Sequence, residues 1–264
     1  MHKRCLGSTN IEVSAIGLGT VKIGRNQGVS YPASFSLPKD REVSTLLHVA
    51  SELGINLLDT APAYGNSEER LGKLLSHRSE WVICTKVGEE FVNGHSEFDF
   101  SSHAIRQSIE RSLRRLKTDY LDIVLVHANG ADEALIREEK VFVTLEELKK
   151  QGKIRCFGLS SKTERGGKLT VDLADVAMVT LNPLQTDDQA VIAYAHQQKK
   201  GIFIKKAFAS GHLEKLHSAD PITDALRFIF KEPGVTSIIT GTINTEHLEE
   251  TVNKAEALLT RSDV

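Results

Sequence analysis

The sequence has few cysteines, and they lie far apart. Three occur in 264 residues, at Cys5, Cys84 and Cys156, which is too few and too scattered for a framework of disulfides. Cys84 and Cys156 fall inside apolar runs typical of strands. We therefore interpret them as small buried side chains of a protein in a reducing compartment.

Long apolar runs and an excess of charge of one sign are also missing. Residues 1–7 lack the apolar region of a signal peptide, and no apolar stretch reaches the length of a membrane span. The formal net charge of -2 gives no general attraction to nucleic acid or acidic membranes. We predict a cytoplasmic protein without a nucleic-acid or membrane partner. The sequence does not indicate an oligomeric state.

Nothing in the chain marks a boundary between domains. It has no linker, low-complexity segment or charge block, and its 40% hydrophobic and 26% charged residues are ordinary for a globular protein. A length of 264 residues suits one α/β barrel. We therefore predict a single domain over residues 1–264.

Runs typical of strands alternate with amphipathic runs typical of helices. The eight strand-like runs are Ala15–Gly19, Ile55–Asp59, Trp81–Lys86, Leu121–His127, Ile154–Ser160, Val176–Asn182, Ile202–Lys206 and Thr236–Thr240. The eight helix-like runs are Lys39–Leu53, Ser67–Leu75, Ser101–Leu116, Val141–Gln151, Lys162–Leu173, Asp187–Lys200, Ala219–Lys231 and Thr245–Leu259. Eight such units predict an α/β protein with a closed (β/α)8 TIM barrel.

Local signals refine the ends of these elements. The first 14 residues fit an antiparallel hairpin that turns near Ser8–Asn10 and closes the barrel floor. Ser101 and Asn244 are typical helix N-caps. Three glycines follow helices and are typical C-terminal caps; they are Gly54, Gly152 and Gly201.

Two long irregular stretches follow strands, so we expect both on the functional face. They are Gly24–Pro38 and Gly88–Phe100, and loops of this length in a compact domain are usually functional or mobile. The second carries three aromatic rings, Phe91, Phe98 and Phe100. These either line an apolar pocket or pack the loop against the barrel, and the sequence leaves both interpretations open.

Polar residues end three successive strand-like runs. Asp59, Lys86 and His127 stand at the tails of these runs, and Tyr64 follows Asp59 in the next loop. Because the C-terminal ends of parallel barrel strands share one face, the four side chains are expected to meet there. Singly, they could be a turn cap, a packed aromatic, a snorkelling lysine and a core histidine. Their joint order favours a proton-transfer site.

The motifs around these residues resemble those of the aldo-keto reductases. The run Gly54–Gly65, with Ser67-Glu68 and Leu71-Gly72 after it, carries most of the resemblance; the other motifs are Leu6-Gly7, Gly17–Thr20, Thr85–Gly88 and Asp119–Asp122 leading to His127. The likeness covers nearly the whole chain and is strongest over residues 6–160. It implies a barrel that binds a nicotinamide cofactor without a Rossmann domain, which agrees with the lack of a G-x-G-x-x-G loop.

The resemblance and elementary chemistry imply one role for each of the four residues. Tyr64 would donate a proton to the oxygen of a carbonyl as it is reduced, and Lys86 would lower the pKa of that phenol. Asp59 would compensate the buried charge of Lys86. His127 would hydrogen-bond the carbonyl oxygen. The expected activity is NAD(P)(H)-dependent interconversion of aldehydes or ketones and alcohols.

The second half of the chain departs from the family where the cofactor is expected. Ser160 keeps the family's serine, but Ser161 replaces an asparagine and Met178 a glutamine of the carboxamide clamp. Asn182 is kept. Lys205 and Lys206 follow where an aromatic is frequent, and we expect one of them to face the barrel mouth, toward the cofactor pyrophosphate or an anionic substrate.

The run before the last helix is expected to hold the cofactor's far end. A helix N-terminus suits a phosphate. His247 stands at about the position where the family has an arginine, and Gly241 stands where the family frequently has a lysine. Glu250 would contact the adenine. We favour NADP(H), with NAD(H) possible, and predict no metal site. The predicted cofactor-binding residues are Gly19, Thr20, Ser160, Ser161, Met178, Asn182, Lys205, Lys206, Ser210, Gly211, Gly241, Thr242, Asn244, His247 and Glu250.

Two other functions stay open at this point. A nicotinamide-binding sensor or regulator with little turnover would fit the altered carboxamide clamp. A barrel isomerase or lyase fits less well, because the four polar residues form a complete set and no acidic metal cluster is present. Val264 follows the last helix closely, so we expect an open pocket whose specificity comes from Gly24–Pro38, Gly88–Phe100 and Asn129–Lys140. Such a pocket favours small aldehydes or sugar-like polyols.

Overall fold

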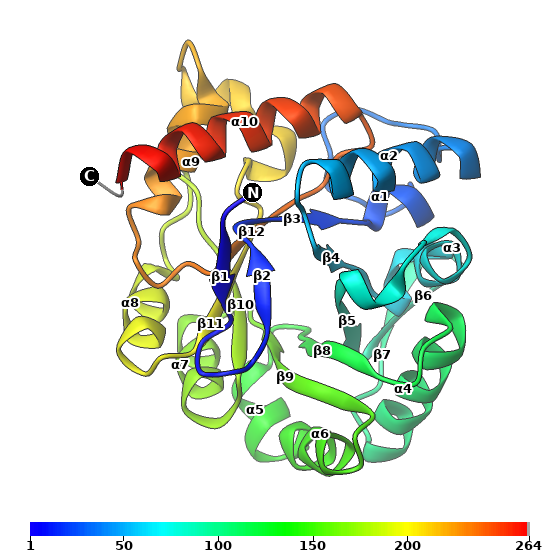
Figure 1. Ribbon diagram of the computed structural model, residues 1–264. Helices are drawn as coiled ribbons and strands as arrows, with labels where there is room; N and C mark the ends of the chain where they lie inside the picture. Colours follow the sequence, from blue (N-terminus) through cyan, green and yellow to red (C-terminus); the bar gives the residue numbers. More distant parts are fainter. Residues whose placement is uncertain (263–264) are drawn as a thin grey trace.

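Eight parallel strands form a closed barrel, as predicted (Figure 1). The computed structural model describes residues 1–262. The strands follow the order β10-β11-β12-β3-β4-β5-β8-β9 around the barrel. Their bounds are β3 Ile16–Gly19, β4 Leu57–Asp59, β5 Val82–Val87, β8 Leu121–His127, β9 Ile154–Ser160, β10 Val176–Thr180, β11 Gly201–Lys205 and β12 Ser237–Thr240. Each predicted strand is confirmed: β8 and β9 have the predicted ends, and the ends of the others differ by at most two residues.

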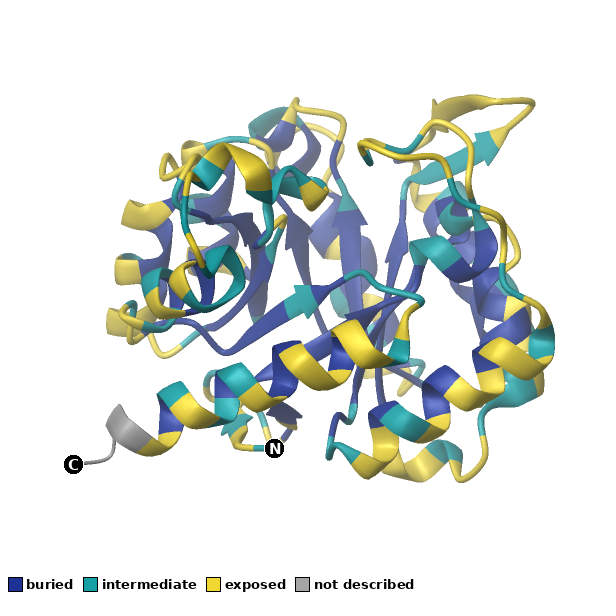
Figure 2. Cartoon of the chain, turned by 90° about the horizontal axis from the view of Figure 1, so that it is seen from above, coloured by how far each residue is buried: buried dark blue, intermediate teal, exposed yellow. Residues whose placement is uncertain are grey.

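The predicted helices are also present and surround the barrel. Their bounds are α2 Asp40–Glu52, α3 Ser67–Leu74, α4 Ser102–Leu116, α6 Val141–Lys150, α7 Glu164–Leu173, α8 Gln189–Gln197, α9 Pro221–Phe230 and α10 Thr245–Ser262. In α4, Ile105, Ile109 and Leu113 recur at helical spacing and are buried, because that face lies on the sheet. Figure 2 shows this banding, with buried faces inward and exposed faces outward.

Short helical turns, which the sequence pattern does not separate, lie in the connections. They are α1 Val21–Gly24, η1 Pro62–Tyr64, η2 Arg78–Glu80, α5 Asp132–Arg137, η3 Ala209–Gly211 and η4 Leu213–Leu216. No helix of residues 1–262 combines the length and the apolar character that crossing a bilayer requires.

The strands bury both faces, which explains their continuous apolar runs. Along β8, Ile123 and Leu125 belong to a core inside the barrel, while Val124 and Val126 belong to a larger core between the strands and the helices. Successive strand residues point to opposite faces, so one run supplies both cores.

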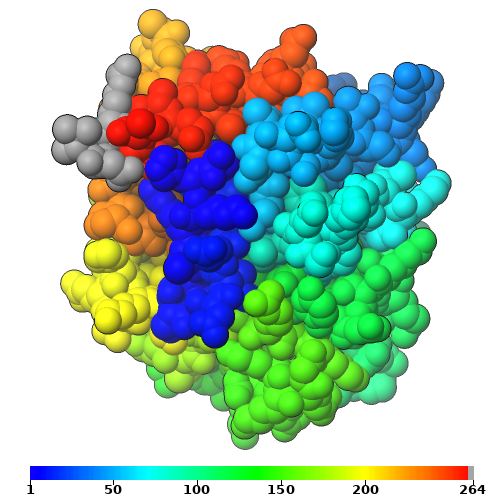
Figure 3. Space-filling model, viewed as in Figure 1, coloured from blue at the N-terminus to red at the C-terminus, as the bar shows by residue number. Residues whose placement is uncertain are grey.

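An N-terminal hairpin closes the barrel floor, as predicted. Strands β1 (Lys3–Cys5) and β2 (Glu12–Ser14) pair antiparallel, and Figure 3 shows this segment, in dark blue, lying across the face of the molecule. Leu6, Ile11 and Val13 are buried in the same core as Cys84 and Phe203 of the barrel interior. The hairpin therefore excludes water from one end of the barrel.

The predicted N-caps and two of the three predicted glycine caps are confirmed. Ser101 accepts a hydrogen bond from the N–H of Ala104 at 3.2 Å, and Asn244 accepts one from the N–H of His247 at 3.1 Å. Gly54 and Gly152 have φ angles of 76° and 75°, in the left-handed region that suits a C-cap.

The prediction for Gly201 is wrong. Gly201 begins β11 and its φ is not in the left-handed region, which Lys199 occupies instead with a φ of 55°. A Cβ at Gly201 would lie 2.3 Å from Cδ1 of Leu6. This glycine therefore makes room for the hairpin that closes the floor.

The stretch Gly88–Phe100 is not irregular, contrary to our prediction. It contains a second hairpin, β6 (Glu89–Val92) and β7 (His95–Phe98). Its turn is Asn93-Gly94, and the φ angles of these residues are 50° and 86°. An Asn-Gly sequence favours the tight two-residue turns of hairpins, in which both φ angles are positive.

We predict that truncating the floor plug destabilises the fold. Leu6→Ala should lower the free energy of unfolding by about 2–5 kcal/mol, because Leu6 is fully buried and its loss leaves a cavity. Leu173→Ala, on the outer face of α7 where Leu173 is 54% exposed, should change it by less than about 0.5 kcal/mol. Urea unfolding measures both changes in the free energy of unfolding, provided that the dependence on urea concentration has the same slope in the wild type and the variants. Equal effects would contradict the proposed role of the hairpin.

Candidate active site

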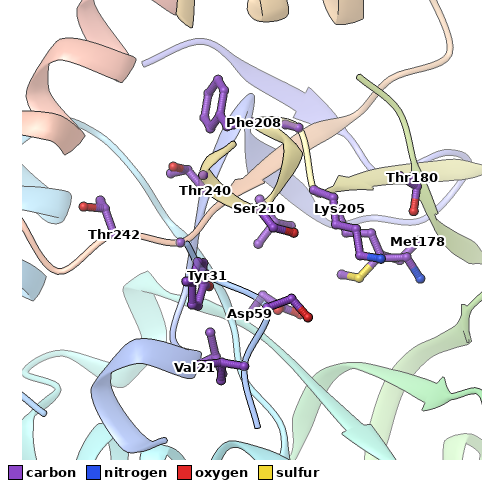
Figure 4. A pocket seen from close by; sticks show the side chains of 18 of the residues that line it. Val21, Tyr31, Asp59, Met178, Thr180, Lys205, Phe208, Ser210, Thr240 and Thr242 are labelled. Atoms are coloured by element: carbon purple, nitrogen blue, oxygen red, sulfur yellow. The ribbon is translucent and has the colours of Figure 1, made fainter. Parts of the chain in front are cut away.

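A large cavity opens at the C-terminal ends of the barrel strands. Its volume is about 910 Å³, and Figure 4 shows part of its lining. Every barrel strand contributes at least one residue to it: Gly19, Asp59, Lys86, His127, Ser160, Thr180, Lys205 and Thr240. All four residues predicted to be catalytic line this one cavity.

A buried ion pair stands at the centre of the site. Lys86 Nζ lies 2.5 Å from Asp59 Oδ1 and donates a second hydrogen bond, of 2.9 Å, to the carbonyl oxygen of Thr60. The two side chains are 2% and 5% exposed. The register of β4 and β5 places Asp59 beside Cys84, so Lys86, two residues on, points to the same face of the sheet.

The carboxylate keeps the buried lysine charged. Burial by itself would lower the pKa of Lys86, but the attraction of Asp59 and the nearby phenol of Tyr64 raise it above its ordinary value. A charged ammonium at this depth is stable only with such a partner. The site therefore holds a permanent positive charge beneath the phenol.

Tyr64 lies over this pair. Its hydroxyl is 3.5 Å from Asp59 Oδ2, and the centre of its ring is 4.7 Å from Lys86 Nζ. We predict from the sequence that Lys86 lowers the pKa of Tyr64. Lys86 does act to lower this pKa, but the effect of burial is larger. Burial and the charge of Asp59 together raise the pKa of the phenol above its ordinary value. Tyr64 thus carries its proton at neutral pH.

His127 faces the same space and has a partner that the sequence did not reveal. The rings of His127 and Tyr64 are 6.2 Å apart and nearly perpendicular. Nδ1 of His127 lies 2.6 Å from Oε2 of Glu89, at the start of β6. Burial lowers the pKa of His127, while Glu89 opposes this effect and Lys86 reinforces it.

Lys205 occupies the opposite wall of the cavity, beside Met178 and Thr180 (Figure 4). Its ammonium donates hydrogen bonds to Ser160 Oγ at 2.9 Å and to the carbonyl oxygen of Ser161 at 2.6 Å. Burial lowers the pKa of Lys205 to about 7, although Asp188 opposes this effect. The charge of this lysine is therefore set by small changes in its surroundings.

Most of the residues predicted to bind a cofactor line the cavity. Those residues are Gly19, Thr20, Ser160, Ser161, Met178, Lys205, Lys206, Ser210, Gly211, Gly241, Thr242, His247 and Glu250. Both lysines of the pair reach it, because β11 ends at Lys205 and Lys206 has a left-handed φ of 55°. The strand alternation from which we expect a single inward lysine ends at that point.

Asn182 and Asn244 do not line the cavity. Asn182 is buried; its amide donates to the carbonyl oxygen of Lys206 at 2.9 Å and its side-chain oxygen accepts from the N–H of Leu184. Asn244 caps α10. In this structure both side chains support the backbone that shapes the site.

The loop after α1 supplies lining residues that sequence patterns did not single out. Residues 29–33 of this loop line the cavity, and Tyr31 packs its ring 3.9 Å from Lys22 Nζ. A Cβ at Gly241 would lie 3.0 Å from the Tyr31 hydroxyl, so the loop reaches across to the segment between β12 and α10. The length of Gly24–Pro38 was the one available signal.

The three phenylalanines of residues 88–100 lie outside the cavity lining. The ring centre of Phe91 is 3.6 Å from the guanidinium carbon of Arg25, and Phe100 packs against Gly88, whose Cβ would lie 2.4 Å from it. Of the two interpretations that the sequence left open, packing of the segment is the one that the structure supports.

The cavity suits an extended dinucleotide. It runs from Tyr64 and His127 to His247 and Glu250 at the first turns of α10, where a helix N-terminus favours a phosphate. Lys206 and Ser210 lie along the lining between these ends. The hydroxyl of Ser161 is buried in this lining and has no hydrogen-bond partner among residues 1–262, which leaves a polar group for a bound ligand.

Comparison with known proteins places the chain in one family. A model of the aldo/keto reductase family matches residues 15–221. A crystal structure of a Pseudomonas aeruginosa protein assigned to the aldo-keto reductases is 48% identical, covers 97% of this chain and 96% of its own, and superposes with a TM-score of 0.89.

Two curated relatives extend this result. The uncharacterized oxidoreductase YqkF of Bacillus subtilis (strain 168) is 27% identical over 97% of this chain and 92% of its own length. The NADH-specific methylglyoxal reductase of Escherichia coli (strain K12) is 35% identical over 61% of this chain and 52% of its own length. With the closed barrel and its cavity, these matches establish that the chain belongs to the aldo/keto reductase family, whose members are nicotinamide-dependent oxidoreductases.

Proposed function

We propose that this protein interconverts small aldehydes or ketones and the corresponding alcohols, with Tyr64 as the general acid and base. One observation carries the proposal. The phenol of Tyr64 lies against the buried Lys86–Asp59 pair, inside a cavity that continues to the N-terminus of α10.

The side chains divide the work of proton transfer. When bound, the nicotinamide cofactor supplies the hydride for reduction or accepts it in oxidation. Tyr64, protonated at neutral pH, gives its proton to the substrate oxygen in reduction and takes one back in oxidation. Lys86 stabilises the phenolate that remains, because its ammonium stays charged beside the ring. Asp59 keeps Lys86 charged and fixes its position.

The wall that carries Lys205 would hold the cofactor. Lys205, with Ser160 and Ser161, presents polar groups close to the catalytic residues, and Lys206 lies exposed at the rim, where it suits a pyrophosphate. The unpartnered hydroxyl of Ser161 supports a polar contact here. In this arrangement the hydroxyls and Lys205 take the place of the amide side chains that the chain lacks at Ser161 and Met178.

We favour NADP(H) as the cofactor. His247 lies in the first turn of α10 and lines the far end of the cavity, where the helix N-terminus and an imidazole together suit a second phosphate. Gly241 offers no charge there. A relative that is NADH-specific makes NAD(H) the alternative to test.

Replacing the phenol should abolish turnover without abolishing binding. With NADPH and a panel of small aldehydes, Tyr64→Phe should lower kcat by about 10²- to 10⁴-fold, because the substrate oxygen loses its proton donor. The absorbance of the reduced cofactor measures turnover, and its fluorescence measures binding.

Tyr194→Phe is the matched control, because Tyr194 lies on α8 and bonds Asp172 outside the cavity; its turnover should equal that of the wild type. Binding without turnover in the wild type would favour a nicotinamide-binding sensor. Failure to bind either nucleotide would contradict both functions.

Removing His247 should weaken NADPH binding selectively. His247→Ala should raise the Kd for NADPH about tenfold, the cost of one hydrogen bond to a charged group, and leave the Kd for NADH nearly unchanged. Fluorescence titrations measure both constants. His196→Ala, on the exposed face of α8, should change neither. Equal losses for the two nucleotides would disprove a phosphate contact at His247.

The lowered pKa of Lys205 predicts a pH-dependent stability. Above pH 7 the folded lysine is neutral, whereas the unfolded lysine stays charged up to its ordinary value of 10.5. The unfolded state then binds more protons, so the free energy of unfolding should rise between pH 7 and 9, by up to about 1.4 kcal/mol per pH unit.

Lys205→Met should flatten this rise, and Lys206→Met should keep it. Urea unfolding of the wild type and both variants at several pH values measures the slope. Parallel curves for the wild type and Lys205→Met would show that Lys205 is charged in the folded protein.

A further inference from the structure

Glu89 stands behind His127 and outside the cavity. Its Oε2 lies 2.6 Å from Nδ1 of His127, its other oxygen accepts a hydrogen bond from the hydroxyl of Ser96 at 2.6 Å, and its side chain is 11% exposed. Glu89 is absent from the cavity lining, whereas His127 is part of it. The β6–β7 hairpin thus holds a carboxylate against one nitrogen of a ring whose other side faces the cavity.

The groups that face His127 have opposing effects on its charge. Lys86 from β5 and Lys205 from β11 disfavour the imidazolium, as burial does, while Glu89 from β6 favours it. Tyr64 from η1 meets the ring edge-on and is neutral. Burial raises the pKa of Glu89, but the contacts with His127, Ser96 and Arg25 lower it below its ordinary value. An ionised carboxylate therefore faces a predominantly neutral imidazole at neutral pH.

This contact decides which nitrogen of the neutral ring carries the proton. A neutral imidazole has one N–H and one lone pair. Without a proton, Nδ1 would be an electron-rich atom 2.6 Å from a carboxylate oxygen, and two such atoms at that distance repel each other. The contact lacks the geometry of a hydrogen bond, so the preference for a proton on Nδ1 is electrostatic and rests on the short distance to a negative charge.

Nε2 is then the nitrogen that serves the substrate. In the part of the chain that the structure describes, no group hydrogen-bonds to Nε2, and the ring lines the cavity. With the proton on Nδ1, Nε2 of the neutral ring bears a lone pair. It can accept a hydrogen bond from a hydroxyl, but it cannot donate one to a carbonyl oxygen.

We propose that Glu89 is a positioning residue that holds neutral His127 in the Nδ1-protonated tautomer, so that His127 accepts from an alcohol and donates to a carbonyl only as the imidazolium. The part about substrates rests on the proposed function. In reduction the imidazolium keeps its proton and donates a hydrogen bond, while the O–H bond of Tyr64 breaks and the new alcohol O–H forms. The protein thereby distinguishes its two substrates by one proton on His127.

The consequence is a divergence of the two Michaelis constants with pH. As the pH rises through the pKa of His127, the KM for an aldehyde should increase, because the donor is lost, and the KM for the alcohol should decrease, because an acceptor appears. Removing the charge of Glu89 lowers the pKa of His127, so both changes should move to lower pH. A merely structural role of Glu89 would not separate the two constants in this way.

Nuclear magnetic resonance of the full, cofactor-free chain with ¹⁵N-labelled histidine tests the tautomer directly. The His127 signals are those missing from His127→Gln. The expected wild-type spectrum at a pH above the pKa shows Nδ1 protonated and Nε2 unprotonated. Glu89→Gln should lower the pKa of His127 by about 1 or more, the usual effect of removing an opposite charge at this distance.

Glu90→Gln is the matched control, because the neighbouring carboxylate contacts Arg111 instead; it should leave the pKa of His127 at the wild-type value. Glu89→Asp keeps the negative charge but draws it back from the ring by one methylene group, and should lower the pKa of His127 by less. This variant decides the matter if Glu89→Gln does not fold.

Three results would overturn the proposal. They are a neutral wild-type ring protonated on Nε2, a pKa of His127 that is equal in Glu89→Gln and Glu90→Gln, and Michaelis constants for aldehyde and alcohol that change together with pH. The spectra require no turnover, so an inactive protein with the expected tautomer would disprove the proposed function and still support the placement of the proton by Glu89.

Discussion

The buried pair of Lys86 and Asp59 is the constraint on which the site depends. An ammonium that is 2% exposed must keep a carboxylate beside it, because the unpaired charge would be very costly in the protein interior. That requirement joins the ends of β4 and β5 and fixes the turn after β4, since Lys86 also bonds the carbonyl oxygen of Thr60. Tyr64 follows on that turn, and its phenol comes to lie on the pair.

Charged and titratable side chains succeed one another outward from this centre. From the buried pair to the β6–β7 hairpin, the series is Asp59, Lys86, the imidazole of His127, Glu89 and Arg25. Lys205 faces this series from the opposite wall of the cavity. In such a site each neighbour changes the proton affinity of the next. In the proposed function the same side chains would therefore serve reduction and oxidation, depending on which of them holds a proton.

Much of the architecture could be predicted because it follows from local patterns. The apolar runs are buried on both faces of the strands, the amphipathic runs lie on them, and the polar residues Asp59, Lys86 and His127 come after runs that the barrel needs as strands. The β6–β7 hairpin was missed although its Asn93-Gly94 turn is a recognised signal, because its strands are four residues long, largely exposed, and mix polar and apolar residues on each face. The prediction of a helix cap at Gly201 was wrong, because this position requires a glycine for a different reason: the side chain of Leu6, from the distant N-terminus, packs against it.

By itself, the sequence determined the order of the strands and helices, the closure of the floor and the face on which the polar strand ends meet, since periodicity and strand length act along the chain. Only the tertiary structure decided how those polar groups are protonated. The contact of Glu89 with His127, the burial that keeps the proton on Tyr64 and the lowered pKa of Lys205 all arise between residues far apart in the chain. Desolvation and charge are properties of a three-dimensional neighbourhood, and no linear pattern specifies them.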